Sequence, residues 1–231
     1  MRFAIPPVPA ATVPVAGSDA VFPVHRIYCV GRNYVEHAIE MGATGREPPF
    51  FFMKPADAVL PVADGTVGAL PYPAMTQNYQ YELELVVAIG KAGADIAAAD
   101  AMQYVWGYAI GLDMTRRDLQ AEAKELRRPW DTGKAFAHSA PIGPIHAADA
   151  VGAPGARRIE LTVNGEPRQR GTVDQMIWRI DEMIEYLSRY FTLQPGDLIF
   201  TGTPAGVGAV VRGDVMDGRI EGLGSLRLKV V

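Results

Sequence analysis

Several features that mark particular protein classes are missing from this sequence of 231 residues. Cys29 is the only cysteine, so no disulfide can form within the chain, which fits a reducing compartment. No apolar run is long enough to span a bilayer. The first residues, MRFAIPPVPAATVPVAG, are interrupted by prolines and lack the apolar core of a signal peptide. We therefore expect a soluble, cytoplasmic protein.

Positive charge is also scarce. The net charge is −4 and the isoelectric point is near 5.6, and the lysines and arginines are scattered rather than clustered. A nucleic-acid-binding surface therefore has no electrostatic support. Hydrophobic residues make up 48% of the chain, which is enough for a sizeable core. We expect a Pro/Ala-rich N-terminal arm over residues 1–24 and one folded domain over residues 25–231.

The hydrophobic pattern predicts more strand than helix. Strands are expected at residues 26–30, 50–53, 81–89, 105–114, 159–163, 198–201 and 226–231. The Asn164-Gly165 pair predicts a hairpin turn after residue 163. Regular alternation of strand and helix is absent, which argues against a Rossmann or TIM-barrel fold. The expected class is α+β, mostly β, with a mixed or antiparallel core.

Four helices are predicted from caps and periodicity. Asn33 is expected to cap a short helix over residues 34–41, and Asp95 a helix that ends near residue 104. Thr115 is expected to cap the helix RDLQAEAKELR, which Pro129 stops. Apolar residues at helical spacing predict an amphipathic helix over residues 173–191.

Two glutamates stand out in an otherwise apolar strand. Glu82 and Glu84 flank Leu83, so both carboxylates point to the same face of the strand. Two anions on one face repel each other and are costly to bury, and a divalent cation removes both costs. From this pattern alone, the solvent face of an edge strand is the simpler interpretation.

Asp113 shifts the balance towards a metal site, because it ends the buried run VWGYAIGLD. Its alternative role is that of a helix cap. Three carboxylates offer hard oxygen ligands that suit Mg²⁺ or Mn²⁺ better than zinc. Three acids and one dication leave a formal charge of −1. An anionic substrate would then need cations nearby, and Arg117 and Lys134 are available.

His37 and Glu40 are a candidate acid–base pair. If residues 33–41 are helical, the two side chains lie on one face, and the carboxylate orients the imidazole and raises its basicity. Such a pair can activate water. A solvated surface turn is the plain alternative. Cys29 lies on a buried-looking strand and is expected to be a core residue.

The segment TGTPAGVG invites comparison with a phosphate-binding loop, but it lacks the Gly-Lys-Ser/Thr ending of that motif. A tight turn after a strand, where glycine supplies positive φ, is the structural alternative. Backbone amides and threonine hydroxyls in such a turn also suit a carboxylate.

These segments together resemble a known family. YCVGRNYVEHAIEM, PFFFMKPADA, YELELVVAIGK, GYAIGLDMTRRDLQ, RPWDTGKAF, LTVNGE and GDLIFTGTPAGVG follow one another in family order from about Ile27 to the C-terminus. The chain is similar to the shorter members of the fumarylacetoacetate hydrolase family: acylpyruvases, oxaloacetate decarboxylases and fumarylpyruvate hydrolases. The resemblance implies a β-roll or mixed β-sandwich of the family's C-terminal domain type, and a homodimer.

The resemblance also implies roles for individual residues. The metal ligands fall on Glu82, Glu84 and Asp113, with one Mg²⁺ or Mn²⁺ per subunit, and the acid–base dyad falls on His37 and Glu40. The other matched positions are a catalytic lysine and residues that contact substrate: Lys134, Arg117, Gln120, Thr201, Gly202 and Thr203.

The implied reaction is hydrolysis of a carbon–carbon bond in an acylpyruvate. Within the family, the resemblance is closest to enzymes that hydrolyse fumarylpyruvate, as in gentisate breakdown, and the second carboxylate of this substrate needs a cation. Arg32, Arg46 and Lys54 are candidates, with surface solvation as the alternative for Arg46. Oxaloacetate decarboxylation, hydroxydienoate isomerisation and a non-catalytic metal- or ligand-binding role on the same scaffold are the alternatives.

Overall fold

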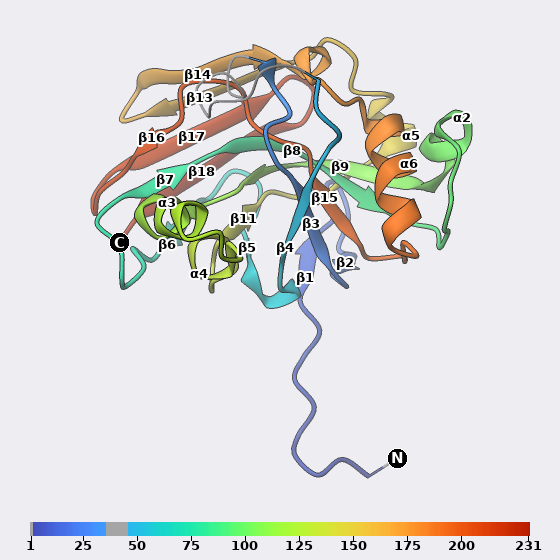
Figure 1. The fold of residues 1–231 in the computed structure, drawn as a ribbon, viewed down its shortest axis with the longest axis horizontal. Helices are drawn as coiled ribbons and strands as arrows, with labels where there is room; N and C mark the ends of the chain where they lie inside the picture. The colour runs from blue at the N-terminus through green and yellow to red at the C-terminus, as the bar shows by residue number, and fades with distance from the viewer. Residues whose placement is uncertain (1, 36–45) are drawn as a thin grey trace.

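Two mixed sheets form the body of the computed structural model, which describes residues 2–35 and 46–231 (Figure 1). The larger sheet is antiparallel except at β3·β15 and β5·β11, which are parallel, and β12 (His146–Ala147) pairs with β9 outside the main order. The order of its strands is β4 (Phe51–Lys54), β3 (Ile27–Val30), β15 (Leu198–Phe200), β8 (Leu83–Ile89), β9 (Val105–Leu112), β11 (Ala140–Ile142) and β5 (Val59–Pro61).

The second sheet has five strands and packs against the first. Its order is β14 (Glu166–Thr172), β13 (Arg158–Val163), β17 (Val215–Ile220), β18 (Gly224–Val230) and β6 (Val67–Leu70). A small third sheet holds β10 (Thr115–Arg116), β7 (Tyr79–Tyr81) and β16 (Gly208–Ala209). The predicted hairpin joins β13 to β14, and Asn164 and Gly165 both have the positive φ that its turn requires. The predicted class, mostly β with mixed sheets, is confirmed.

Strand β8 separates two hydrophobic clusters by simple alternation. Leu85 and Val87 belong to the cluster between the two large sheets, whereas Val86 and Ala88 belong to the cluster on the opposite face. Leu83 points to the first face, where it packs against Gly218 of β17. Glu84 therefore projects from the same face as Val86, away from the five-stranded sheet.

Helices lie around the edges of the sheets. Figure 1 shows α6 (Ile180–Tyr190) near α2 (Ala98–Ala101) and α5 (Ala148–Val151), while α3 (Arg117–Glu125) and α4 (Asp131–Lys134) lie together on the other side. The described residues also form three single 3₁₀ turns: η1 (Ala56–Ala58), η2 (Met102–Tyr104) and η3 (Val173–Gln175). No helix within the described parts of the chain has the length and apolarity needed to cross a membrane.

The predicted long helix over residues 173–191 is broken. Its second half is α6, whose Met183 and Leu187 enter the core as expected, but η3 ends at Gln175. The reason is tertiary. The backbone oxygen of Asn33 accepts the N–H of Ile177, and its side-chain oxygen accepts the N–H of Trp178 at 2.7 Å, so these donors leave the helical pattern.

Two predicted helix caps are also wrong. Asp95 has a φ of 48°, and α2 begins only at Ala98 with Ala97 as its N-cap. Thr115 lies in β10 and its hydroxyl donates to the Asp113 carbonyl, so α3 begins at Arg117 without a side-chain cap. Pairing of Thr115 with β7 outweighs its local capping preference.

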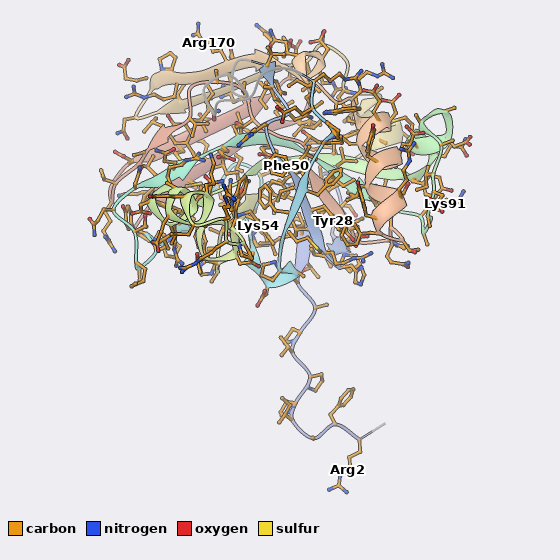
Figure 2. The ribbon with its side chains drawn as sticks, viewed as in Figure 1. Arg2, Tyr28, Phe50, Lys54, Lys91 and Arg170 are labelled. Atoms are coloured by element: carbon orange, nitrogen blue, oxygen red, sulfur yellow. The ribbon has the colours of Figure 1, made fainter. Side chains whose placement is uncertain are left out.

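The N-terminal segment has two parts. β1 (Thr12–Pro14) and β2 (Val21–Pro23) form a hairpin whose Val13 and Phe22 are buried in the core cluster on the outer face of β8. Residues 2–11 extend away from the body, with Arg2 near the tip (Figures 1 and 2).

Candidate metal centre

The ladder between β8 and β9 brings three acidic side chains together. Glu84 pairs with Gly111 and Leu83 with Leu112, and the Asp113 N–H donates to the Glu82 carbonyl at 2.9 Å, so Glu82 and Asp113 are the next cross-strand neighbours. Carboxylate oxygens of all three acids lie within 4.8 Å of one another. Glu82, Glu84 and Asp113 are only 6%, 2% and 1% exposed. A solvent-facing edge strand is therefore excluded.

One detail of the strand prediction needs correction. Glu82 lies between β7 and β8 rather than inside one continuous strand. The N–H of Leu83, at this break, is bound by the side-chain oxygen of Gln169 at 3.0 Å. The common orientation of the two glutamates survives the break, because Glu82 still pairs with Asp113.

Lys134, the last residue of α4, lies between two of the carboxylates. Its ammonium donates to Glu82 Oε2 at 2.8 Å and to Asp113 Oδ2 at 2.7 Å. Burial alone lowers the pKa of Lys134, but the charges of Asp113 and Glu82 outweigh this and raise it above its ordinary value. The Asp113 carboxylate is thus bound by a lysine. The alternative interpretation of Asp113 as a helix cap is excluded.

Lys54, at the end of β4, is a second buried lysine in the centre; Figure 2 marks Phe50 and Lys54 near opposite ends of this strand. Its ammonium lies 2.8 Å from Asp113 Oδ1, outside hydrogen-bond geometry, and donates to the carbonyls of Met114 and Lys134. The sequence marked Lys54 as a candidate for the distal substrate carboxylate. That role stays a prediction, and in this structure the ammonium is engaged by protein oxygens.

Arg117 closes the other side of Glu82. Its guanidinium donates to Glu82 Oε1 at 2.5 Å, to Gln120 Oε1 at 2.6 Å and to Gln80 Oε1 at 2.7 Å. Gln120 is buried, and its orientation is fixed by this contact. The sequence-predicted pair Arg117 and Gln120 therefore lies beside the carboxylates, with the arginine acting on Glu82.

Glu84 is the least compensated of the three acids. The hydrogen bond that the structure gives its carboxylate comes from the Gly202 N–H, at 2.8 Å to Oε2. Burial raises the pKa of Glu84 well above its ordinary value, and the charges of Asp113 and Glu82 raise it further. Glu84 is therefore a buried carboxylate with little compensating charge, and it lies next to two other carboxylates. Such a cluster is suited to a divalent cation that takes oxygen ligands. Glu82, Glu84 and Asp113 are the residues that would hold it.

The TGTP turn after β15 braces β8. Thr201 Oγ1 donates to the Leu85 carbonyl at 2.9 Å, and Thr203 Oγ1 donates to the Leu83 carbonyl at 2.8 Å. The element that follows is strand β16, so no helix N-terminus is present for a phosphate. The predicted substrate contacts of Thr201, Gly202 and Thr203 stay predictions, since their donors in this structure are engaged within the protein.

Two amide side chains hold this turn in place, and sequence reasoning missed both roles. Asn33 donates to the Thr201 carbonyl at 2.8 Å and lies so close to Gly202 that a Cβ there would be 2.7 Å from that of Asn33. Gln169 donates to Thr203 Oγ1 and to the Pro204 carbonyl, both at 2.8 Å. Position 202 therefore requires glycine for two reasons: a Cβ would collide with Asn33, and the backbone φ is 96°.

A small cleft reaches Glu82 of the triad. Arg32 lines it, together with side chains already placed at the centre and three aromatic rings: Glu82, Arg117, Gln120, Lys134, Phe50, Phe52 and Trp130.

Arg46 does not line this cleft. It pairs with Glu182 of α6 at 2.7 Å and stacks on Trp178. The predicted dyad, His37 and Glu40, lies outside the described residues. Cys29 is buried, as expected of a core residue.

Comparison with known proteins agrees with this arrangement. The family model for the fumarylacetoacetate (FAA) hydrolase C-terminal domain matches residues 26–231. The curated fumarylpyruvate hydrolase of Ralstonia sp. is 47% identical over 80% of this chain and 93% of its own length. The mitochondrial oxaloacetate tautomerase FAHD1 of Rattus norvegicus is 43% identical over 88% of this chain and 90% of its own.

The fold is shared as well. A crystal structure of fumarylpyruvate hydrolase from Pseudomonas aeruginosa, in complex with Mn²⁺ and pyruvate, is 57% identical with a TM-score of 0.98, and the match covers 100% of this chain and 99% of that one. The sequence resemblance, the two-sheet fold and the buried acidic triad thus point the same way, and the chain belongs to the fumarylacetoacetate hydrolase family.

Proposed function

We propose that this protein is a divalent-metal-dependent hydrolase that cleaves fumarylpyruvate to fumarate and pyruvate. The observation that carries the proposal is the buried triad of Glu82, Glu84 and Asp113, with carboxylate oxygens within 4.8 Å of one another. The similarity to fumarylpyruvate hydrolases, one of them bound to Mn²⁺ and pyruvate, supports both the metal and the substrate. The cation is Mn²⁺ or Mg²⁺, one per subunit.

The charge of the centre supports a dianionic substrate. Three carboxylates are already matched by three buried or half-buried cations: Lys54, Lys134 and Arg117. The formal charge of −1 that the sequence predicted counts only the three acids and a dication, and therefore omits these side chains. With them included, a bound dication brings the centre to +2, which complements a diketo acid with a carboxylate at each end.

The chain's own groups supply the proton chemistry. His37, oriented by Glu40, takes a proton from water, and the hydroxide adds to the distal carbonyl. The C–C bond then breaks, and its electron pair leaves with the pyruvoyl fragment as an enolate, which is protonated to pyruvate. The dication, when bound, supplies the positive charge that favours this leaving group. Lys134 and Gln120 line the cleft, where they can donate to developing oxyanions.

A second reaction at the same centre is favoured by the FAHD1 relatives, which are named oxaloacetate tautomerases. Tautomerisation of oxaloacetate moves a proton through an enol and breaks no C–C bond. In the deciding assay, purified protein loaded with Mn²⁺ is incubated separately with fumarylpyruvate, acetylpyruvate and oxaloacetate. Pyruvate release and enol absorbance are measured for each substrate. Fumarylpyruvate should have the highest kcat/KM. Turnover of oxaloacetate alone would replace the hydrolase assignment, and turnover of none would revive the non-catalytic binding role.

His37→Ala should lower kcat for fumarylpyruvate by about 10² to 10⁴-fold, the usual contribution of a general base. Mn²⁺ affinity should stay close to that of the wild type, because the metal ligands are the three carboxylates. Steady-state kinetics and calorimetric titration with Mn²⁺ measure the two quantities separately. Normal turnover in this variant would refute the dyad, and loss of Mn²⁺ binding would assign the histidine a different role.

We also propose that the protein is a cytoplasmic homodimer of the gentisate pathway. The N-terminal segment supports the dimer, because it extends away from the body and exposes three apolar side chains that a second subunit could cover (Figure 1). Phe3, Ile5 and Val8 are 59%, 74% and 84% exposed. Deleting residues 2–11 should weaken self-association, measured by light scattering across a dilution series. A full-length protein that is monomeric at every concentration would contradict the dimer, and an unchanged dimer after deletion would exclude the segment.

A further inference from the structure

Two cations lie against aromatic rings that line the cleft, and we call these cations the rim: Arg32, which itself lines the cleft, and Lys124. Arg32 follows β3, and its guanidinium carbon lies 5.7 Å from the centre of the Phe50 ring. Lys124 is in the last turn of α3, and its ammonium lies 6.0 Å from the centre of the Trp130 ring. The Phe50 and Trp130 rings meet edge to face, 5.4 Å apart. Arg32 and Lys124 thus flank a single aromatic pair.

Neither cation is neutralised within residues 2–35 and 46–231, where no acidic side chain forms an ion pair with Arg32 or Lys124. Arg32 Nε is buried and has no hydrogen-bond partner among the residues that the structure describes. Burial lowers the pKa of Lys124, the charges of Arg32 and Arg117 lower it further, and the charge of Glu82 opposes them without reversing the shift. Buried donors without acceptors and neighbouring like charges are both unfavourable, and an anion between them relieves both.

The cations nearer the triad are already engaged. Lys54, Lys134 and Arg117 each bind a carboxylate of the acidic triad. Arg32, Phe50 and Trp130 share the wall of one cleft with Glu82 and Lys134. A molecule with one anionic end beside Glu82 would therefore extend past these side chains towards Lys124.

We propose that Arg32 and Lys124 bind the second carboxylate of a dicarboxylate substrate, while Phe50 and Trp130 present their rings to its flat conjugated chain. This proposal rests on the proposed function, and it assigns the choice between diacid and monoacid acylpyruvates to the rim. Charge-assisted hydrogen bonds supply the selection, because a substrate that lacks the second carboxylate leaves both cations unpaired.

The test is a selectivity ratio. For Lys124→Gln, kcat/KM for fumarylpyruvate divided by that for acetylpyruvate, which lacks the distal carboxylate, should fall about tenfold or more, mainly through KM. Lys124→Arg should restore most of the ratio, because it keeps the charge. Arg127→Gln is the matched control: it removes one positive charge from the same segment, but Arg127 is exposed and, unlike Lys124, has no contact with the Trp130 ring among the described residues, so the ratio should stay unchanged. An equal loss for both substrates in Lys124→Gln would overturn the proposal.

A binding measurement separates this proposal from the proposed function. Calorimetric titration of the Mn²⁺-loaded protein with fumarate and with crotonate compares a diacid and a monoacid of similar shape without any turnover. The wild type should bind fumarate more tightly, and Lys124→Gln should lose that preference. Equal affinity of the wild type for both acids would show that the rim is not a carboxylate site. If the wild type prefers fumarate but does not turn over fumarylpyruvate, only the proposed reaction is contradicted.

Discussion

Glu84→Gln is expected to abolish cleavage of fumarylpyruvate while stabilising the metal-free protein in alkaline solution. The substitution removes one of the three proposed metal ligands, so kcat/KM should fall by about three orders of magnitude or more. Its effect on stability has the opposite sign. Burial and two neighbouring carboxylates raise the folded-state pKa of Glu84, so its charged form opposes folding.

The sign of the pH dependence follows from that raised pKa. The stability that protonated Glu84 contributes is present at low pH and is lost as the pH rises through its folded-state pKa. Thermal melts of metal-free protein between about pH 5 and about pH 9 should show this decline in the wild type and a weaker one in the glutamine variant. Added Mn²⁺ should raise the wild-type melting temperature most at high pH, where binding releases no proton, and should leave the variant unchanged.

Glu82→Gln is the informative control, because it removes a neighbouring proposed ligand whose hydrogen-bond partners differ from those of Glu84. Glu82 accepts from Arg117 and Lys134, so neutralising it leaves two buried cations with fewer partners. Both variants should lose metal and activity, but only Glu82→Gln should destabilise the metal-free protein. A Glu84→Gln protein that keeps Mn²⁺-dependent stabilisation, or that turns over within tenfold of the wild type, would exclude Glu84 as a ligand.

The acidic triad could be predicted from the sequence because it depends on local rules. A period of two places Glu82 and Glu84 on one face, and an aspartate directly after an apolar strand calls for a buried partner. The pairing of Glu84 with Gly111 then carries Asp113 to the same place. Only the continuity of the strand through Glu82 was wrong, because that break depends on Gln169, which is 86 residues from Leu83 in the chain.

The surrounding contacts could not be predicted, because their partners are distant in sequence. Lys54 ends an ordinary strand, and nothing in FFFMK shows that its ammonium lies 2.8 Å from Asp113. Asn33 was expected to cap a helix, yet its side chain binds Trp178 and Thr201, which are 145 and 168 residues away. The same contact breaks the predicted helix before α6. Tertiary hydrogen bonds to buried amides thus override local capping signals.

Lys54→Met should be the most destabilising of the single substitutions considered for this centre. The change keeps the length of the buried side chain but removes the charge beside Asp113 Oδ1 and the donor to the carbonyls of Met114 and Lys134. Removing one partner of a buried ion pair leaves an uncompensated charge and costs about 3–5 kcal/mol. Urea unfolding of the metal-free protein measures this cost as a fall in the free energy of unfolding.

An exposed ion pair gives the comparison that this estimate needs. Arg189 and Glu185 pair at 3.1 Å on the surface of α6, so Arg189→Met should cost less than about 1 kcal/mol. If Lys54→Met costs as little as that, the lysine is not a structural partner of the triad. Adding Asp113→Asn to Lys54→Met then tests the pairing directly. The double variant should be less destabilised than the sum of the two single variants, because the asparagine removes the buried charge that the methionine left without its partner.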